Sequence, residues 1–437
     1  MENTYNYLKN VLLDLKKESS KNPSIIGVVL VLLCIPLLYA FNSISLALLV
    51  GITLYTFKKE NFKTETNLIL PIALFGLMAL SILWSINVSD SVKAISKGLP
   101  LLLIPLSFML FSRLTKNQKE KIVQIYSFGI VIYILFCLLK AIIRFVITHN
   151  SGVFFYHELV TEDVNAIHVS VYVSVAIFYF ITRSFSSVLS KTIIIILTVF
   201  LILLSSKNII IIFFGLLILY FLRYYKSQIK RKTFVMVMLF CILALITFSG
   251  KIKERFLIEF QSNVKENTIN KEISTDTGKV YNVSVKQAWN QDKFNASYYF
   301  PGTAFRVYQI RIFKEMLSKD AIFFTGYGLN ATDSKIEEKS IEHNLYDGYG
   351  NKNFHNEYIQ IFAEIGIFGL LLLLAMIFIN LKNAVKTKDF MHISFAVLMI
   401  SLFLTESFLS RQRGIVFFTI FYCLFNADNL IVASKKE

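Results

Sequence analysis

The chain has 437 residues, of which 55% are hydrophobic and only 17% are charged, and its mean hydropathy is +0.58. A water-soluble domain could not bury so much apolar surface, so these values exclude a soluble protein and predict a polytopic membrane protein. The net charge of +16 does not indicate nucleic-acid binding, because the cations fall mostly in short loops and form no alternating basic–aromatic patch.

The apolar runs are long and continuous, which favours helices over the alternating strands of a barrel. At about twenty apolar residues per span, they predict an all-α membrane protein with about twelve transmembrane helices. The predicted spans cover residues 24–41, 44–57, 67–86, 99–111, 122–147, 166–182, 192–206, 208–222, 233–249, 358–380, 391–409 and 414–432. The four cysteines lie inside apolar runs without metal-ligand spacing, which indicates packing roles.

Charge differs between successive short loops. Most loops that we place inside are rich in Lys and Arg, whereas the loop at 149–165 carries acidic residues and neither Lys nor Arg. The positive-inside rule then predicts that both termini are cytoplasmic. Residues 1–22 are polar and basic and lack the apolar core of a cleavable signal.

The predicted spans and loops divide the chain into three parts. Residues 1–249 form an N-terminal membrane region of about nine spans, residues 250–354 a long outer (periplasmic) domain, and residues 355–437 a C-terminal region of three spans. The outer segment has 15 Lys and Arg against 13 Asp and Glu, so it is an ordinary mixed-charge domain.

The outer segment is predicted to be mostly helical. Periodicity predicts helices over 251–264 and 304–317, and the polar stretches 267–295 and 334–353 are predicted loops. The segment contains no phosphate-binding loop, dinucleotide fingerprint or HExxH zinc motif, so nucleotide or metal chemistry has no support. No metal site and no cofactor are predicted.

A polar pair, His355-Asn356, stands where this segment enters a very apolar run. Histidine exchanges protons near neutral pH, so His355 is a candidate base at the membrane boundary. The alternative is a polar first turn of a helix without chemistry. Gly366 and Gly369 follow, and they are read as positions where this span packs closely against a neighbour.

Three cations are candidate anion ligands. Lys207 stands in a tight connection between two apolar runs, where a charge indicates a nearby anion or a side chain that reaches the headgroups. Arg306 and Arg311 belong to the predicted helix 304–317, and arginine forms bidentate bonds with phosphate. For Arg311, an (i, i+4) pair with Glu315 is the alternative.

Further candidates lie on the predicted outer face. Arg411 and Arg413 occupy a turn just after Glu406, against the positive-inside trend, which favours a role with an anion or with Glu406. His157 and His168 flank the outer end of the sixth span, and packed histidines are the commoner explanation for each. A histidine and several cations on one face suit a lipid-linked diphosphate, with the cations holding it and a base activating a hydroxyl.

The motif residues resemble a known family. His355-Asn356, nine residues and then Gly366-x-x-Gly369 match the H-[NSQ]-x9-G-x-x-G pattern of the O-antigen ligase and polymerase superfamily. Gly326-Tyr327-Gly328 resembles the family's R…GxG region, and Glu406-Ser407 with the following turn resembles Bacteroidetes-type members. Lys207 stands where family members usually have an arginine. A lysine keeps the positive charge but cannot form the bidentate hydrogen bonds of a guanidinium.

The resemblance implies a GT-C-like glycosyltransferase of the bacterial inner membrane, active in lipopolysaccharide biosynthesis of the cell envelope. Its donor would be an undecaprenyl-diphosphate-linked glycan and its acceptor a sugar hydroxyl of lipid A–core or another glycan, with inversion and without metal. It implies His355 as the general base, with Asn356 in the site. It implies that Lys207 and Arg306 would hold the diphosphate, with Arg311 as a further candidate.

Two other functions stay open. A polymerase of the same superfamily needs the same donor site and the same base, so one sequence does not separate it from a ligase. A secondary transporter is disfavoured, because such folds place broken helices and polar residues at the midplane, whereas the ionisable residues here gather at one surface. The oligomeric state is not predicted.

Overall fold

The computed structural model describes residues 2–62, 64–183, 188–224, 257–263, 265–270, 273–275 and 278–427. Among these, five helical stretches are long and apolar enough to cross a membrane: Thr66–Trp84 (α4 and η2), Val88–Leu110 (α5 and α6), α7 (Lys116–Thr148), α9 (Ala166–Arg183) and α17 (Glu357–Thr387). The other long helices are α1 (Glu2–Lys21), α2 (Ser24–Cys34), α3 (Tyr39–Tyr55), α10 (Val188–Leu203), α11 (Lys207–Arg223), α18 (Phe390–Phe403) and α19 (Gln412–Asn426). The chain is therefore a multi-pass helical membrane protein.

The helices follow the predicted apolar runs, except that the run at 233–249 lies outside the described residues. The break between the first two runs falls earlier than predicted, at residues 35–38 rather than 42–43. Pro36 has no backbone N–H to continue α2, so the helix ends before it. Asn42, which the sequence suggests as the break, lies inside α3 and donates from Nδ2 to the carbonyl of Cys34 at 2.8 Å.

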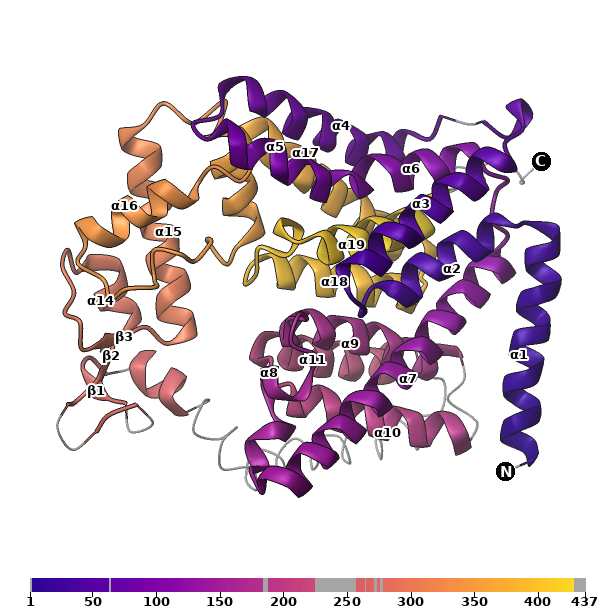
Figure 1. The fold of residues 1–437 in the computed structure, drawn as a ribbon, viewed down its shortest axis with the longest axis horizontal. Coiled ribbons are helices and arrows are strands. Elements are labelled where there is room, and N and C mark those ends of the chain that lie inside the picture. Colours follow the sequence, from indigo (N-terminus) through magenta and orange to yellow (C-terminus); the bar gives the residue numbers. More distant parts are fainter. Residues whose placement is uncertain are drawn as a thin grey trace.

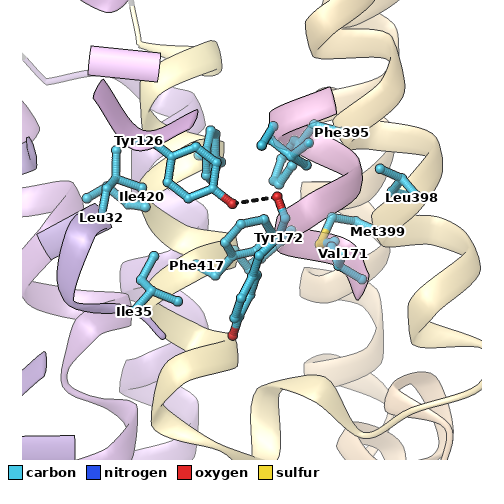
Figure 2. Packing of buried hydrophobic residues seen from close by; sticks show 14 of the residues in the cluster. Leu32, Ile35, Tyr126, Val171, Tyr172, Phe395, Leu398, Met399, Phe417 and Ile420 are labelled. Carbon is cyan, nitrogen blue, oxygen red and sulfur yellow. Dashed lines mark hydrogen bonds between the residues drawn. The ribbon is translucent and has the colours of Figure 1, made fainter. Parts of the chain in front are cut away.

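The centre of the bundle is aromatic. Tyr126 of α7 and Tyr172 of α9 are fully buried, and the Tyr126 hydroxyl donates to the backbone carbonyl of Tyr172 at 3.0 Å (Figure 2). Phe417 and Phe421 of α19 pack against these rings with centroids 4.8 Å and 5.1 Å apart. The buried hydroxyl of Tyr126 is thereby hydrogen-bonded, whereas the buried hydroxyl of Tyr172 has no hydrogen-bond partner among the described residues.

The described residues of the outer segment form a small domain at one end of the bundle, and α1 lies at the opposite end (Figure 1). Its strands are β1 (Thr268–Ile269), β2 (Tyr281–Asn282) and β3 (Tyr298–Tyr299), with β1 antiparallel and β3 parallel to β2. Its helices are α14 (Val285–Asn290), α15 (Gly302–Lys319) and α16 (Asp333–Glu342), and residues 257–263 are also helical. The short helices η1 (Lys59–Asn61), η3 (Ser151–Phe154), α8 (Tyr156–Leu159) and η4 (Phe408–Ser410) complete the described elements.

The predicted helix at 304–317 is confirmed as α15. The predicted loop at 267–295 is interrupted by the helix α14, and the predicted loop at 334–353 is wrong over its first part. Residues of α16 form a helix there, and Ile336 is buried in the core of the outer domain together with Tyr308 and Ile312 of α15. Burial of this single apolar side chain helps to hold the polar sequence in a helix, which its local composition does not predict.

The first half of α17 is set off by a kink. Gly366 has φ +72°, in the left-handed region, so Ala363 and Ile367 no longer bond to each other. The carbonyl of Ala363 instead accepts from the Tyr327 N–H at 2.8 Å, and the Ile367 N–H donates to the carbonyl of Phe323 at 2.9 Å. The kink therefore pairs with the loop at residues 323–328, which we call the docking loop.

Replacement of Gly366 by alanine tests this pairing. A Cβ at Gly366 would collide with the Phe324 carbonyl, and the positive φ adds strain of about 1–3 kcal/mol. We expect Gly366→Ala to lower the thermal unfolding midpoint of the purified protein in detergent. The matched control is Gly76→Ala in α4, where an added Cβ meets nothing within 4 Å. Equal midpoints for the two variants would contradict a structural role for the kink.

Candidate functional site

His355 and Asn356 lie at the start of α17, as the sequence predicts. Asn356 is the N-cap: its Oδ1 accepts from the Ile359 N–H at 3.2 Å, and its Nδ2 donates to the carbonyl of Leu404 at 3.3 Å. His355 precedes the helix with φ +46°, and its side chain is 29% exposed. The ring therefore stands at the edge of the protein interior, edge-on to Phe305 of α15 with centroids 5.9 Å apart.

Glu406 is the closest charged partner of His355. The carboxylate is 9% exposed, and its Oε2 lies 3.4 Å from His355 Nδ1. Burial alone would raise the pKa of Glu406. The hydrogen bond with His355 and the charges of His355 and Arg306 outweigh burial and lower the pKa below its ordinary value. The group facing the imidazole at neutral pH is thus a carboxylate.

Arg306 joins the same cluster from α15. Its Nη2 lies 3.5 Å from Glu406 Oε1, its Nε donates to the carbonyl of Thr405 at 2.9 Å, and its Nη1 donates to the carbonyl of Gly302 at 3.1 Å. These contacts use three of the five N–H donors of a guanidinium. Among the described residues, the other two donors have no partner and can bind an anion, and the arginine is already fixed in place.

Lys207, at the start of α11, lies on the other side of the first turn of α15. Its Nζ is 2.8 Å from Glu259 Oε2, and Glu259 Oε1 also accepts the backbone N–H of Thr303. A Cβ placed on Gly302 would lie 3.1 Å from Arg306 Nη1 and 3.6 Å from Glu259 Oε2. Glu259, which holds Lys207, and Arg306 therefore both lie beside Gly302 at the start of α15.

Arg311 lies in a different cluster. It is buried, and its donors go to Glu315 at 2.8 Å, to Asp292 at 2.9 Å and to the carbonyl of Gln291 at 2.6 Å. These contacts connect α15 to the loop after α14. The structure does not bring Arg311 together with His355, and the (i, i+4) pair with Glu315 is present.

Arg411 and Arg413, at the start of α19, differ from each other in burial. Arg413 is buried, donates to the carbonyls of Leu37 and Asp163, and lies over the Tyr39 ring with its guanidinium carbon 4.0 Å from the centroid. These contacts connect α19 to the loops before α3 and α9. Arg411 is exposed.

His157 is exposed in the short helix α8, where its ring packs against that of Tyr156 with centroids 4.0 Å apart. Gly369, unlike Gly366, faces its own helix, because an added Cβ would meet Ile361 and Ile365 of α17.

One group of described residues has a geometry suited to a metal ion. Ligand atoms of Glu315, Glu342 and His343 lie within 4.8 Å of one another. Lys339 donates to both carboxylates, at 2.9 Å and 2.7 Å, and Arg311 donates to Glu315. A divalent ion would have to compete with these two cations, so the group is an ion-pair network of the outer domain.

Two carboxylates at the site have roles that the sequence does not indicate. Glu406 faces His355 across 51 positions, and Glu259 faces Lys207 across 52. The sequence suggests Glu406 only as a partner for the nearby arginines of the last turn. The sequence could have drawn attention to Glu406, because it is an acidic residue between two apolar helices. Nothing in the sequence marks Glu259 in this way.

The comparison with known families agrees with the motif. Residues 192–374 match the model of the O-antigen ligase family, which supports membership of the O-antigen ligase superfamily. The match includes Lys207, Arg306, His355 and the two motif glycines, and it ends before Glu406. No curated protein matches the chain.

The ion-pair network of the outer domain predicts a pH dependence. Hydrogen bonds from Lys339 and Lys319 lower the pKa of Glu342 from 4.5 to about 2. Burial raises the pKa of Glu315, but Lys339 and Arg311 lower it overall. A depressed carboxyl pKa stabilises the fold above the unfolded value of 4.5, and this stabilisation is lost as the pH falls from 4.5 toward 2.

We expect the outer domain to unfold first in that window. The measurement is the fluorescence of Trp289 in α14, obtained as the difference between each protein and its Trp289→Phe variant, which retains Trp84. Glu342→Gln should reduce the loss of stability of the outer domain between pH 4.5 and 2. An identical acid transition in the two proteins would contradict the role of this carboxylate.

Proposed function

We propose that this protein is an O-antigen ligase, a GT-C-like, inverting and metal-independent glycosyltransferase of the bacterial inner membrane. It transfers a glycan from an undecaprenyl-diphosphate carrier to a sugar hydroxyl of lipid A–core. The observation that carries the proposal is the contact of His355 and Arg306 through Glu406, in a chain whose residues 192–374 match the O-antigen ligase family. The outer domain would be periplasmic and both termini cytoplasmic.

The proposed reaction is a single displacement. The acceptor hydroxyl gives its proton to His355 Nε2, and its oxygen forms a bond with the anomeric carbon. The bond from that carbon to the diphosphate oxygen breaks, and undecaprenyl diphosphate leaves with the electron pair. Histidine is the side chain most often used as a general base in such a proton transfer.

Two cations stabilise the departing diphosphate. Arg306 has donors left and is held by the backbone of α15 and the turn after α18. Lys207 supplies a second charge across the first turn of α15. Positive groups fixed in advance at the place where charge develops lower the barrier without reorganisation. Arg311 and Arg413 bind groups of the protein instead, so we assign them a structural role in stabilising the fold. Arg411 and His157, both exposed, are left as candidates for the acceptor side.

The first test is His355→Ala in a transfer assay with purified protein, undecaprenyl-diphosphate glycan and lipid A–core. Loss of the base should reduce kcat by roughly 10²- to 10⁴-fold while the protein still inserts and folds. His149→Asn is the control, since His149 is exposed at the end of α7 in a left-handed conformation that asparagine tolerates. Normal transfer by His355→Ala would contradict the catalytic assignment.

A deletion strain separates the ligase from a polymerase. We expect loss of long glycan from lipid A–core and accumulation of carrier-linked polymer. Lipid A–core capped with single repeats would instead indicate a polymerase. Uptake of substrate by the protein in liposomes, without transfer, would indicate a transporter.

The second test concerns the pairing of Lys207. Because Glu259 holds Lys207 Nζ and the Thr303 N–H, a diphosphate binding there must displace this carboxylate. Glu259→Gln should therefore lower KM for the donor by roughly three- to tenfold, with a smaller change in kcat. The matched control is Glu266→Gln, which removes an exposed pair with Lys286 in the same domain. A raised KM would contradict diphosphate binding at Lys207.

A further inference from the structure

We propose that Glu406 is the positioning residue of His355: it holds the Nδ1–H of the imidazole and so directs Nε2 to the acceptor. Glu406 lies outside the region that matches the O-antigen ligase family. The inference rests on the proposed function for its catalytic meaning, but the pairing of Glu406 with His355 can be tested without any transfer reaction.

The first support is the rigidity of the turn that carries Glu406. The carbonyl of Leu404 accepts from Asn356 Nδ2, and the carbonyl of Thr405 accepts from Arg306 Nε. The N–H groups of Thr405 and Glu406 both donate to the carbonyl of Leu402 at 2.9 Å. Bonds on both sides of the carboxylate therefore fix its backbone with respect to the start of α17.

The turn continues along the first turn of α17. The hydroxyl of Ser407 lies 3.3 Å from Gln360 Oε1, and the Leu409 N–H donates to Glu357 Oε2 at 2.7 Å. Glu357 and Gln360 are themselves buried residues of α17. The segment from 404 to 409 and the beginning of α17 thus form one hydrogen-bonded unit, and His355 and Glu406 face each other within it.

The second support is the assignment of the imidazole proton. An ionised carboxylate accepts hydrogen bonds and donates none, so the nitrogen that faces it carries the proton. Since Oε2 faces Nδ1, the neutral ring has its proton on Nδ1 and its lone pair on Nε2. Only that tautomer can take a proton through Nε2.

The third support is the shared use of the carboxylate. Oε1 of Glu406 faces Arg306 and Oε2 faces His355, so one buried group connects the proposed diphosphate ligand to the proposed base. When His355 takes the acceptor proton, the imidazolium forms beside a carboxylate, which stabilises it. The same arrangement of a base oriented by a third group is used in catalytic triads.

The test is Glu406→Gln in the full-length protein, with two measurements. The first is the ¹⁵N spectrum of histidine-labelled protein, in which the signals of His355 are identified by their absence in His355→Gln. We expect the wild-type ring to carry its proton on Nδ1 and the Glu406→Gln ring to shift toward the Nε2–H form. An unchanged tautomer would overturn the inference, whether or not the protein is a ligase.

The second measurement is the transfer reaction of the same variant. We expect kcat to fall by roughly 10²-fold and KM for the donor to change by less than about threefold, because orientation of the base is lost while the cations remain. Glu406→Asp should recover part of kcat, since it restores the charge. The control is Glu338→Gln, an exposed carboxylate of α16 that pairs with Lys335.

A purely structural Glu406 would give a different pattern. The folded fraction of Glu406→Gln would shrink, and the remaining protein would keep the wild-type kcat and tautomer, which overturns the inference. If Glu406→Gln does not fold, Glu406→Asp decides in its place. The shorter side chain withdraws the oxygen from an Nδ1 that is already 3.4 Å away, so wild-type kcat in Glu406→Asp would equally overturn the inference.

Discussion

The pairing between the kink of α17 and the docking loop supports the rest of the candidate site. Two backbone groups that a straight helix would bond to each other, at Ala363 and Ile367, bond instead to Tyr327 and Phe323. An unpaired backbone group inside a membrane protein is costly, so kink and loop stabilise each other. The loop is in turn held by Trp84, whose indole donates to the Thr325 carbonyl at 2.8 Å. The motif glycine at 366 therefore acts through the backbone, at a distance from His355.

This anchoring explains how a histidine at a helix start can hold one orientation. The segment of α17 before the kink is short, and a short helix is not stable by itself. The docking loop holds its far end, while Asn356 and the turn at 404–409 hold its beginning. His355 then lies between two fixed points, and Glu406 reaches it from the second.

The sequence predicts the elements of this structure better than their contacts. The long apolar runs predict the membrane helices because composition alone decides what a bilayer accepts. The polar pair at 355–356 predicts a helix start for the same local reason, and the pair Arg311–Glu315 follows from helical spacing. The partners of His355 and Arg306 could not be predicted, since Glu406 lies 51 and 100 positions away. The helix α16 was missed because a single buried Ile336, rather than local propensity, holds it in place.

Burial separates the cations into two kinds, and this separation bears on the proposed chemistry. Arg311 and Arg413 are almost fully enclosed by protein acceptors, whereas Lys207 and Arg306 keep 26% and 29% of their side chains exposed while each holds a carboxylate. A cation that can exchange its partner needs such partial access to solvent. On the proposed function, a diphosphate drawn to Arg306 would weaken its hold on Glu406 Oε1. The carboxylate would then be free to hold the Nδ1–H of His355 more closely while the donor is bound.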